Sequence, residues 1–108
     1  ILLLGITFKE NCPDIRNTRV IDIYNELKSF GVNIDVYDPW ASADEVMHEY
    51  GIQTMKDRHI NFEKYSSIIL AVAHDEFTND NFSIKKNDNC VVYDVKGVLR
   101  KSLVDARL

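Results

Sequence analysis

The sequence predicts a three-layer α/β domain in which a parallel sheet is covered by helices on both faces. The first observation is a set of nearly continuous apolar runs, which are typical of strands buried on both sides. The second is that segments with helical spacing separate these runs, and the third is that the connections are short. Together they indicate consecutive β-α-β units, which build a parallel sheet through right-handed crossovers.

The predicted strands begin with the first residues of the chain. Core strands are expected at 1–6 (ILLLGI), 33–38 (NIDVYD), 66–73 (SSIILAVA) and 89–95 (NCVVYDV). The first, third and fourth of these are the nearly continuous apolar runs. A weaker fifth strand is expected at 51–55 (GIQTM).

Two amphipathic helices are predicted between the strands. Asn17 or Thr18 is expected to cap the first helix, and Gly31 to end it. Its apolar positions recur at helical spacing: Val20, Ile23, Tyr24, Leu27 and Phe30. In the second helix (ASADEVMHEYG), Ser42 and Glu45 have the spacing of a capping box, and a glycine ends the pattern. The remaining helical or turn segments are expected at 60–65, at 75–82 and, as a terminal helix, at 98–108.

Length and composition restrict the class of protein. The 108 residues correspond to one domain, and the formal net charge of −4 is a poor match for nucleic acid or an anionic membrane. No apolar run approaches the roughly 20 residues of a membrane helix, and no charged segment precedes the apolar start as in a signal peptide. The chain starts inside a predicted core strand without an initiator Met, which indicates a fragment of a longer protein.

Cys12 and Cys90 are the two cysteines of the chain, and they fit a reduced, cytoplasmic setting. Two thiols are too few for a disulfide scaffold, and no Cys/His spacing predicts a zinc site. Cys12 could act as a nucleophile, but no base accompanies it in the local sequence. Packing of Cys12 within its loop is therefore the favoured interpretation.

Ligands of parallel α/β sheets bind at the carboxyl ends of the strands. The segments expected at that edge are 5–13, 38–41, 74–77 and 94–97. The first lacks the Gly-x-Gly-x-x-Gly pattern that lets a backbone approach a pyrophosphate, because only Gly5 stands at the end of the strand. We therefore expect side chains to make any phosphate contact in this loop.

Lys9 and Arg16 are the cations of this loop, and Arg19 follows in the first helical turn. Arginines at a helix N-terminus are favourable if an anion binds between them and the exposed N–H groups. The alternative is solvated surface charge, with Glu10 and Asp14 as ion-pair partners.

Asp38 is the last residue of one predicted strand, and His74 directly follows another. Asp38 has the position of the acidic residue that holds ribose hydroxyls in dinucleotide-binding domains. Without the glycine turn, a structural turn with Pro39, packed against Trp40, is favoured. His74 could act as a base or contact a ligand, but no nucleophile or metal-ligand partner is evident nearby. Capping or hydrogen bonding is therefore the favoured role of His74.

Four motifs occur in a characteristic order: GITFKENCPDIRNTRVIDIYNEL, VYDPWA, AVAHDEF and VVYDVKGVL. Over essentially the whole chain they resemble the C-terminal domain of UDP-glucose/GDP-mannose dehydrogenases. The FKENCPDIRNT segment is most similar to the bacterial branch of this family, UDP-N-acetylhexosamine 6-dehydrogenases of surface polysaccharide synthesis.

The resemblance implies that residues 1–108 form a single Rossmann-like domain that binds the UDP part of a nucleotide sugar. In complete enzymes of the family, an N-terminal domain binds NAD and a central region forms the dimer. A catalytic cysteine in the central part supports oxidation of the sugar C6 alcohol to a carboxylate in two NAD-dependent steps. Cys12 does not match the motif of that cysteine, so this chain alone is expected to be inactive.

The resemblance also implies roles for individual residues. Phe8 and Lys9 match positions that line the nucleotide site, and Lys96 lies near a region that contributes basic contacts to UDP. Arg16 matches the arginine that reaches across the domain cleft toward the NAD pyrophosphate. No catalytic or metal-binding residue is carried over to this chain.

Two alternatives belong to other classes of protein. A free-standing regulatory receiver domain would need a phosphoacceptor Asp at the end of the third strand, where the sequence has Ala73 and His74. A purely structural oligomerisation domain would have no affinity for nucleotides.

Overall fold

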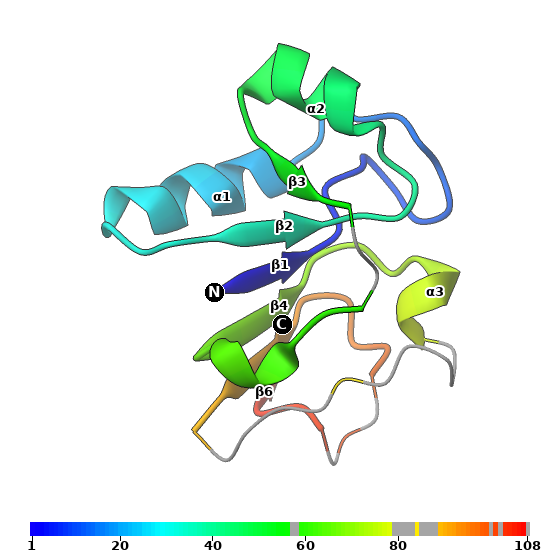
Figure 1. The fold of residues 1–108 in the computed structure, drawn as a ribbon. Coiled ribbons are helices and arrows are strands. Elements are labelled where there is room, and N and C mark those ends of the chain that lie inside the picture. The colour runs from blue at the N-terminus through cyan, green and yellow to red at the C-terminus, as the bar shows by residue number, and fades with distance from the viewer. Residues whose placement is uncertain (57–58, 79–83, 85–88, 100, 102, 108) are drawn as a thin grey trace.

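The computed structural model describes residues 1–56, 59–78, 84, 89–99, 101 and 103–107. Within these residues, six strands form one sheet in the order β3-β2-β1-β4-β5-β6, and every neighbouring pair is parallel. Figure 1 shows β3, β2 and β1 side by side with their arrows pointing the same way. The elements along the chain are β1 (Leu2–Leu4), α1 (Val20–Ser29), β2 (Asp35–Tyr37), α2 (Ala43–Tyr50), β3 (Thr54–Met55), the 3₁₀ helix η1 (Phe62–Lys64), β4 (Ser67–Leu70), α3 (Asp75–Thr78), β5 (Val91–Asp94) and β6 (Ala106–Arg107).

The sheet is covered on both faces, as predicted. The side chains of β1 are fully buried and alternate between two apolar clusters. Leu3 packs in the cluster that contains Val20 of α1 and Val46 of α2. Leu2 and Leu4 lie in the opposite cluster, which is built with η1, α3 and part of the C-terminal tail. This double burial explains why the strand reads as an unbroken apolar run.

All five predicted strands are present, but each is shorter than its apolar segment. The first, for example, covers Leu2–Leu4 rather than 1–6. Gly5 leaves the extended conformation with a φ of 96°, so the chain turns away from the sheet while Ile6 still contributes to the core. An apolar run therefore marks burial, and burial extends beyond the hydrogen-bonded ladder.

The second helix agrees with its predicted signals, whereas the predicted N-cap of the first, Asn17 or Thr18, is wrong: the N-cap is Arg19, which makes no side-chain capping bond. In α2, the Ser42 hydroxyl accepts from the backbone N–H of Glu45, and Gly51 ends the helix in the left-handed conformation. In α1, the hydroxyl of Thr18 accepts from the Val20 N–H at 3.2 Å, and the helix begins at Val20. The segment 60–65 contains η1, and α3 occupies the described part of 75–82.

The predicted terminal helix is wrong. In the described part of 98–108, the tail forms β6, which extends the sheet beside β5. Asp105 explains this outcome, because its backbone N–H donates to the Val92 carbonyl at 2.9 Å and its carboxylate accepts from the Val92 N–H at 2.8 Å. The tail thus pairs with the open edge of β5. This pairing joins segments that are apart in the chain, so local helical spacing does not reveal it.

Candidate functional site at the carboxyl edge of the sheet

Because all described strands run parallel, the loops that follow β1, β2, β4 and β5 lie at one edge of the sheet. The strand order reverses between β1 and β4, which is the point at which open α/β sheets bind their ligands. The loop after β1 spans 5–19 and carries three of the four predicted site residues.

Asp38 links the loops that follow β1 and β2. It is buried, and its Oδ2 accepts from the backbone N–H of Ile6 at 2.7 Å and of Thr7 at 3.1 Å. Its Oδ1 accepts from the N–H groups of Trp40 at 2.8 Å and Ala41 at 3.1 Å. The structure therefore supports the structural-turn interpretation of Asp38 over a ribose contact.

The charge of Asp38 is stabilised inside the protein. Burial alone would raise its pKa, but the hydrogen bonds from His74 and from backbone N–H groups outweigh burial and lower the pKa. A carboxylate that accepts several N–H bonds remains ionised for this reason.

His74 completes the buried network and is fully shielded from solvent. Its Nε2 lies 2.9 Å from Asp38 Oδ2 and 3.1 Å from Thr7 Oγ1. Its Nδ1 accepts the backbone N–H of Asn11 at 2.9 Å. This geometry supports the hydrogen-bonding role predicted for His74.

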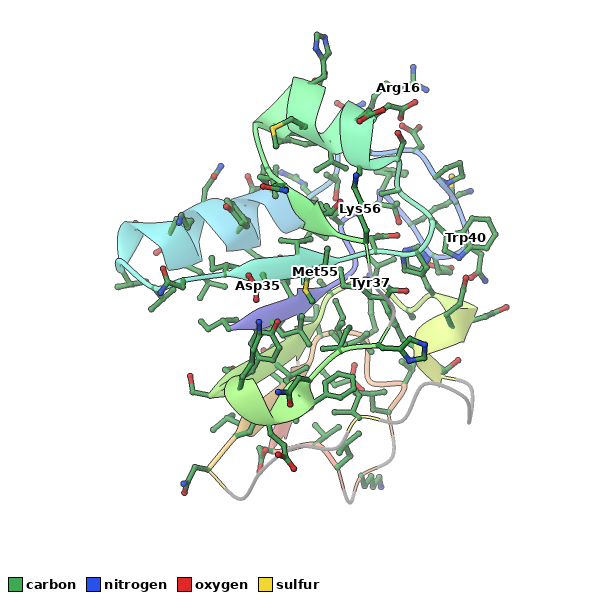
Figure 2. All side chains as sticks on the ribbon, in the orientation of Figure 1. Arg16, Asp35, Tyr37, Trp40, Met55 and Lys56 are labelled. Atoms are coloured by element: carbon green, nitrogen blue, oxygen red, sulfur yellow. The ribbon has the colours of Figure 1, made fainter. Side chains whose placement is uncertain are left out.

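Trp40 covers this network at the surface of the edge. Its ring stacks on that of His74, with 6.1 Å between the ring centroids. Its Nε1 donates to Glu76 Oε1 of α3 at 2.9 Å, although the residue remains 38% exposed. Figure 2 shows Trp40 well apart from Arg16, which lies beside α2.

Phe8 and Lys9 are exposed in the loop after β1. The Phe8 backbone N–H donates to the Asp14 carbonyl at 2.7 Å, which folds the loop back on itself. Lys9 forms no ion pair with any residue that the structure describes. A charged amine at this edge is thus available to an incoming anion.

Lys96 is exposed at the same edge, after β5, so β4 separates its strand from that of Lys9. The loop is shaped by Asp94, whose Oδ1 accepts from the N–H groups of Lys96 at 3.1 Å and Gly97 at 2.8 Å. Asp94 is therefore the counterpart of Asp38: a buried carboxylate at a strand end that orders the loop carrying a cation.

Arg16 is placed differently from the lysines. Its backbone N–H and Nε donate to Asp14 Oδ1 at 2.9 and 3.1 Å, and its Nη2 donates to Oδ2 at 3.3 Å. These hydrogen bonds lower the pKa of Asp14. The ion pair with Asp14 was one of the alternatives in the sequence. Among the described residues, Asp14 accepts from Nε and Nη2 of Arg16 but not from Nη1.

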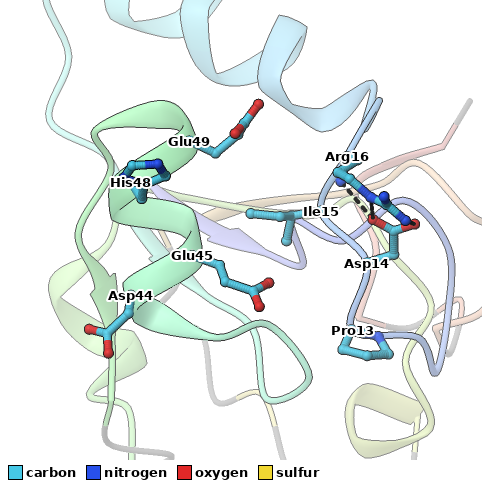
Figure 3. A pocket seen from close by; sticks show the side chains of 8 residues that line it. All are labelled: Pro13, Asp14, Ile15, Arg16, Asp44, Glu45, His48 and Glu49. Carbon is cyan, nitrogen blue, oxygen red and sulfur yellow. Dashed lines mark hydrogen bonds and ion pairs between the residues drawn. The ribbon is translucent and has the colours of Figure 1, made fainter.

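The Arg16 side chain lines a cleft of about 670 Å³ between its loop and α2 (Figure 3). The opposite wall is acidic, with Asp44, Glu45 and Glu49 on α2. The sequence analysis singled out Arg16 but not these carboxylates, because α2 is distant from Arg16 in the chain. Residues missed in the same way are Thr7 and Asn11, whose bonds to His74 join positions more than 60 residues apart.

A parallel sheet of order 3-2-1-4-5-6, which reverses between β1 and β4, defines a Rossmann-like domain, a fold that binds nucleotides in many proteins. Comparison with known proteins is more specific. A sequence model described as the UDP binding domain of the UDP-glucose/GDP-mannose dehydrogenase family matches residues 2–101. The chain therefore belongs to the UDP-glucose/GDP-mannose dehydrogenase family.

Relatives and solved structures agree with this assignment. The chain is 47% identical to a UDP-N-acetyl-D-glucosamine 6-dehydrogenase of Pseudomonas aeruginosa and 43% identical to one of Salmonella typhi, in each case over 100% of this chain. It spans only 26% of the length of either relative. A UDP-glucose dehydrogenase structure from Pyrobaculum islandicum matches 98% of this chain and 24% of that chain, with a TM-score of 0.76 and 19% identity. That structure supports the fold.

The family assignment does not favour a free-standing receiver domain or a purely structural domain.

None of the helices in the described residues has the length and apolar character required to cross a membrane.

Proposed function

We propose that this chain is the nucleotide-sugar-binding domain of an NAD-dependent UDP-sugar 6-dehydrogenase, which oxidises the sugar C6 alcohol to a carboxylate. The observation that carries the proposal is the position of Lys9. It is exposed, has no ion-pair partner among the described residues, and follows β1 where the strand order reverses. In a domain of this family, that position suits a diphosphate.

The proposed division of roles follows the two kinds of cation. Phe8, Lys9 and Lys96 would contact the UDP-sugar at the carboxyl edge. Arg16 would contact NAD with the part of its guanidinium that Asp14 leaves available. The described residues offer NAD no glycine cradle, so the main NAD site and the catalytic cysteine would belong to other domains of a longer chain.

The identities to the two bacterial UDP-N-acetyl-D-glucosamine 6-dehydrogenases favour a UDP-N-acetylhexosamine as substrate. We further propose that the full-length protein is a cytoplasmic homodimer that supplies bacterial surface polysaccharide synthesis. Two reduced cysteines are consistent with this location.

The roles of the two cations can be separated kinetically in the full-length protein. Lys9→Ala is expected to raise the KM for the UDP-sugar, and Arg16→Ala the KM for NAD. A charge-assisted contact to phosphate contributes about 1.5–3 kcal/mol, which corresponds to a rise of roughly 10- to 150-fold. Steady-state kinetics with each substrate varied in turn measures both effects.

The exposed Lys28 of α1 provides the control, since Lys28→Ala should leave both KM values within about twofold. Circular dichroism establishes that each variant is folded. If Lys9→Ala and Arg16→Ala also stay within about twofold for both substrates, the loop is solvated surface and the proposed roles are wrong.

The isolated 108-residue chain is expected to form no NADH from any UDP-sugar. Cys12 does not match the motif of the family's catalytic cysteine, so the thiol chemistry of the reaction would come from another domain. An increase in NADH absorbance, at a rate proportional to the concentration of the chain, would contradict this expectation.

A further inference from the structure

An exposed part of the loop after β1 has one buried side chain at both of its ends. Residues 7–11, here called the Lys9 arch, start at buried Thr7 and run through the exposed residues 8–11. The Thr7 hydroxyl lies 3.1 Å from His74 Nε2, and the Asn11 backbone N–H donates to His74 Nδ1 at 2.9 Å. Nδ1 of His74 thus binds one end of the arch, and Nε2 lies within hydrogen-bonding distance of the other end.

These bonds define the tautomer of His74. Nδ1 accepts the N–H of Asn11 and therefore carries no proton, so the neutral ring has its proton on Nε2. That proton is directed to Asp38 Oδ2 at 2.9 Å, and Thr7 Oγ1 also approaches Nε2. Asp38 itself accepts the Thr7 backbone N–H, which holds the same end of the arch a second time.

The other end is also held by more than one bond. Asn11 has a φ of 54°, a conformation that asparagine tolerates better than most residues. Its side-chain Oδ1 accepts from the backbone N–H of Asp75 at 2.9 Å, next to the bond from its own N–H to His74. Between the two ends, the Thr7 hydroxyl donates to the Lys9 carbonyl at 3.0 Å. The backbone at Lys9 is therefore fixed, although its side chain forms no ion pair with the residues that the structure describes.

We propose that His74 is a positioning residue, which holds the Lys9 arch so that the Lys9 amine meets a nucleoside diphosphate at the carboxyl edge of the sheet. This inference rests on the proposed function of Lys9. His74 acts through the arch and does not itself contact the ligand, because its side chain is fully buried beneath Trp40. Preorganisation of this kind lowers the entropy lost on binding.

Two substitutions in the full-length protein separate the two ring nitrogens. His74→Gln retains a donor in the place of Nε2, toward Asp38, but loses the acceptor for Asn11. His74→Asn retains an acceptor in the place of Nδ1, for Asn11, but loses the contact with Asp38. We expect His74→Gln to raise the KM for the UDP-sugar roughly five- to tenfold, as for one lost hydrogen bond, with the NAD KM within about twofold. His74→Asn, which loses the contact with Asp38 instead, should raise this KM by a smaller factor, about two- to fivefold.

A double-mutant cycle distinguishes positioning from a general structural role. If His74 acts through Lys9, His74→Gln should change the UDP-sugar KM by less than about twofold in a Lys9→Ala background. Hydrogen exchange measured by mass spectrometry should also show faster exchange of the amides of 8–11 in His74→Gln. The exposed Glu26 of α1 provides a control, because Glu26→Gln should leave the UDP-sugar KM and this exchange unchanged.

Each outcome decides the matter. Equal effects of His74→Gln with and without Lys9 would overturn the positioning role, as would unchanged exchange at 8–11. If His74→Gln does not fold, the cycle is run with His74→Asn, whose KM effect should likewise vanish in the Lys9→Ala background. If Lys9→Ala leaves the UDP-sugar KM unchanged, the proposed function of Lys9 fails and the inference falls with it. Faster exchange in His74→Gln would then show that His74 does order the arch, and that the failed claim is the contact between Lys9 and the UDP-sugar.

Discussion

Replacing Gly5 with alanine is expected to destabilise the chain by about 2–5 kcal/mol. Gly5 has a φ of 96°, in the left-handed region where a side chain costs about 1–2 kcal/mol. A Cβ at this position would lie 2.6 Å from the Cβ of Val72 and 2.9 Å from its backbone nitrogen. Val72 is buried, so relief of this overlap requires movement of packed backbone, which costs about 1–3 kcal/mol more.

The measurement is urea unfolding of the 108-residue chain, with Gly31→Ala as the matched control. Gly31 also has a positive φ, of 77°, but nothing lies within 4 Å of the position of its Cβ. Gly31→Ala should therefore lower the free energy of unfolding only by the cost of a side chain at positive φ, about 1–2 kcal/mol. If the two variants lose the same stability, the close contact between Gly5 and Val72 does not contribute to the loss, and the packing argument is wrong.

Asp38→Asn is expected to lower the free energy of unfolding by about 2–4 kcal/mol, although the side chain barely changes in size. Two N–H groups point at Oδ1, and two N–H groups and His74 Nε2 approach Oδ2. An asparagine must place its own NH₂ group against one of these sets of donors, which leaves buried donors without an acceptor. The exposed Glu26→Gln of α1 removes the same charge and should cost less than about 0.5 kcal/mol.

The pH dependence of this difference tests the role of the charge. The pKa of Asp38 is lowered in the folded state, so its carboxylate contributes stability above the ordinary carboxyl pKa of about 3.9. That contribution is lost as the pH falls through the lower folded-state pKa. The difference in unfolding free energy between wild type and Asp38→Asn should thus be largest near neutral pH and shrink below about pH 4. A difference that grows on acidification would show that the neutral form of Asp38 is the one stabilised.

Much of the fold follows from local sequence signals. The run of leucines in β1 indicated a strand buried on both faces, and Leu2–Leu4 are fully buried. The capping residue Ser42 and the stop at Gly51 marked both ends of α2, because caps and left-handed stops depend on neighbouring residues alone. These features account for the α/β class, the parallel sheet and the edge at which the site residues lie.

The tail shows where local signals fail. Its spacing suggested a helix, but the described residues form β6, since the backbone groups of β5 offered an unpaired edge. The ends of the strands were also misplaced, because a run of apolar residues continues into buried loops such as that of Ile6. Both errors come from contacts between segments distant in the chain, to which short-range periodicity is insensitive.

The same distinction applies to the candidate site. The sequence by itself determined which residues lie at or soon after the ends of buried strands: the cations Lys9 and Lys96 and the polar groups Asp38 and His74. Only the tertiary structure decided that the two ring nitrogens of His74 lie at the ends of the Lys9 arch, and that Arg16 is paired with Asp14 opposite an acidic helix. The physical reason is that hydrogen bonds between loops depend on the register and order of the strands that deliver them, and these are set by the packing of the whole sheet.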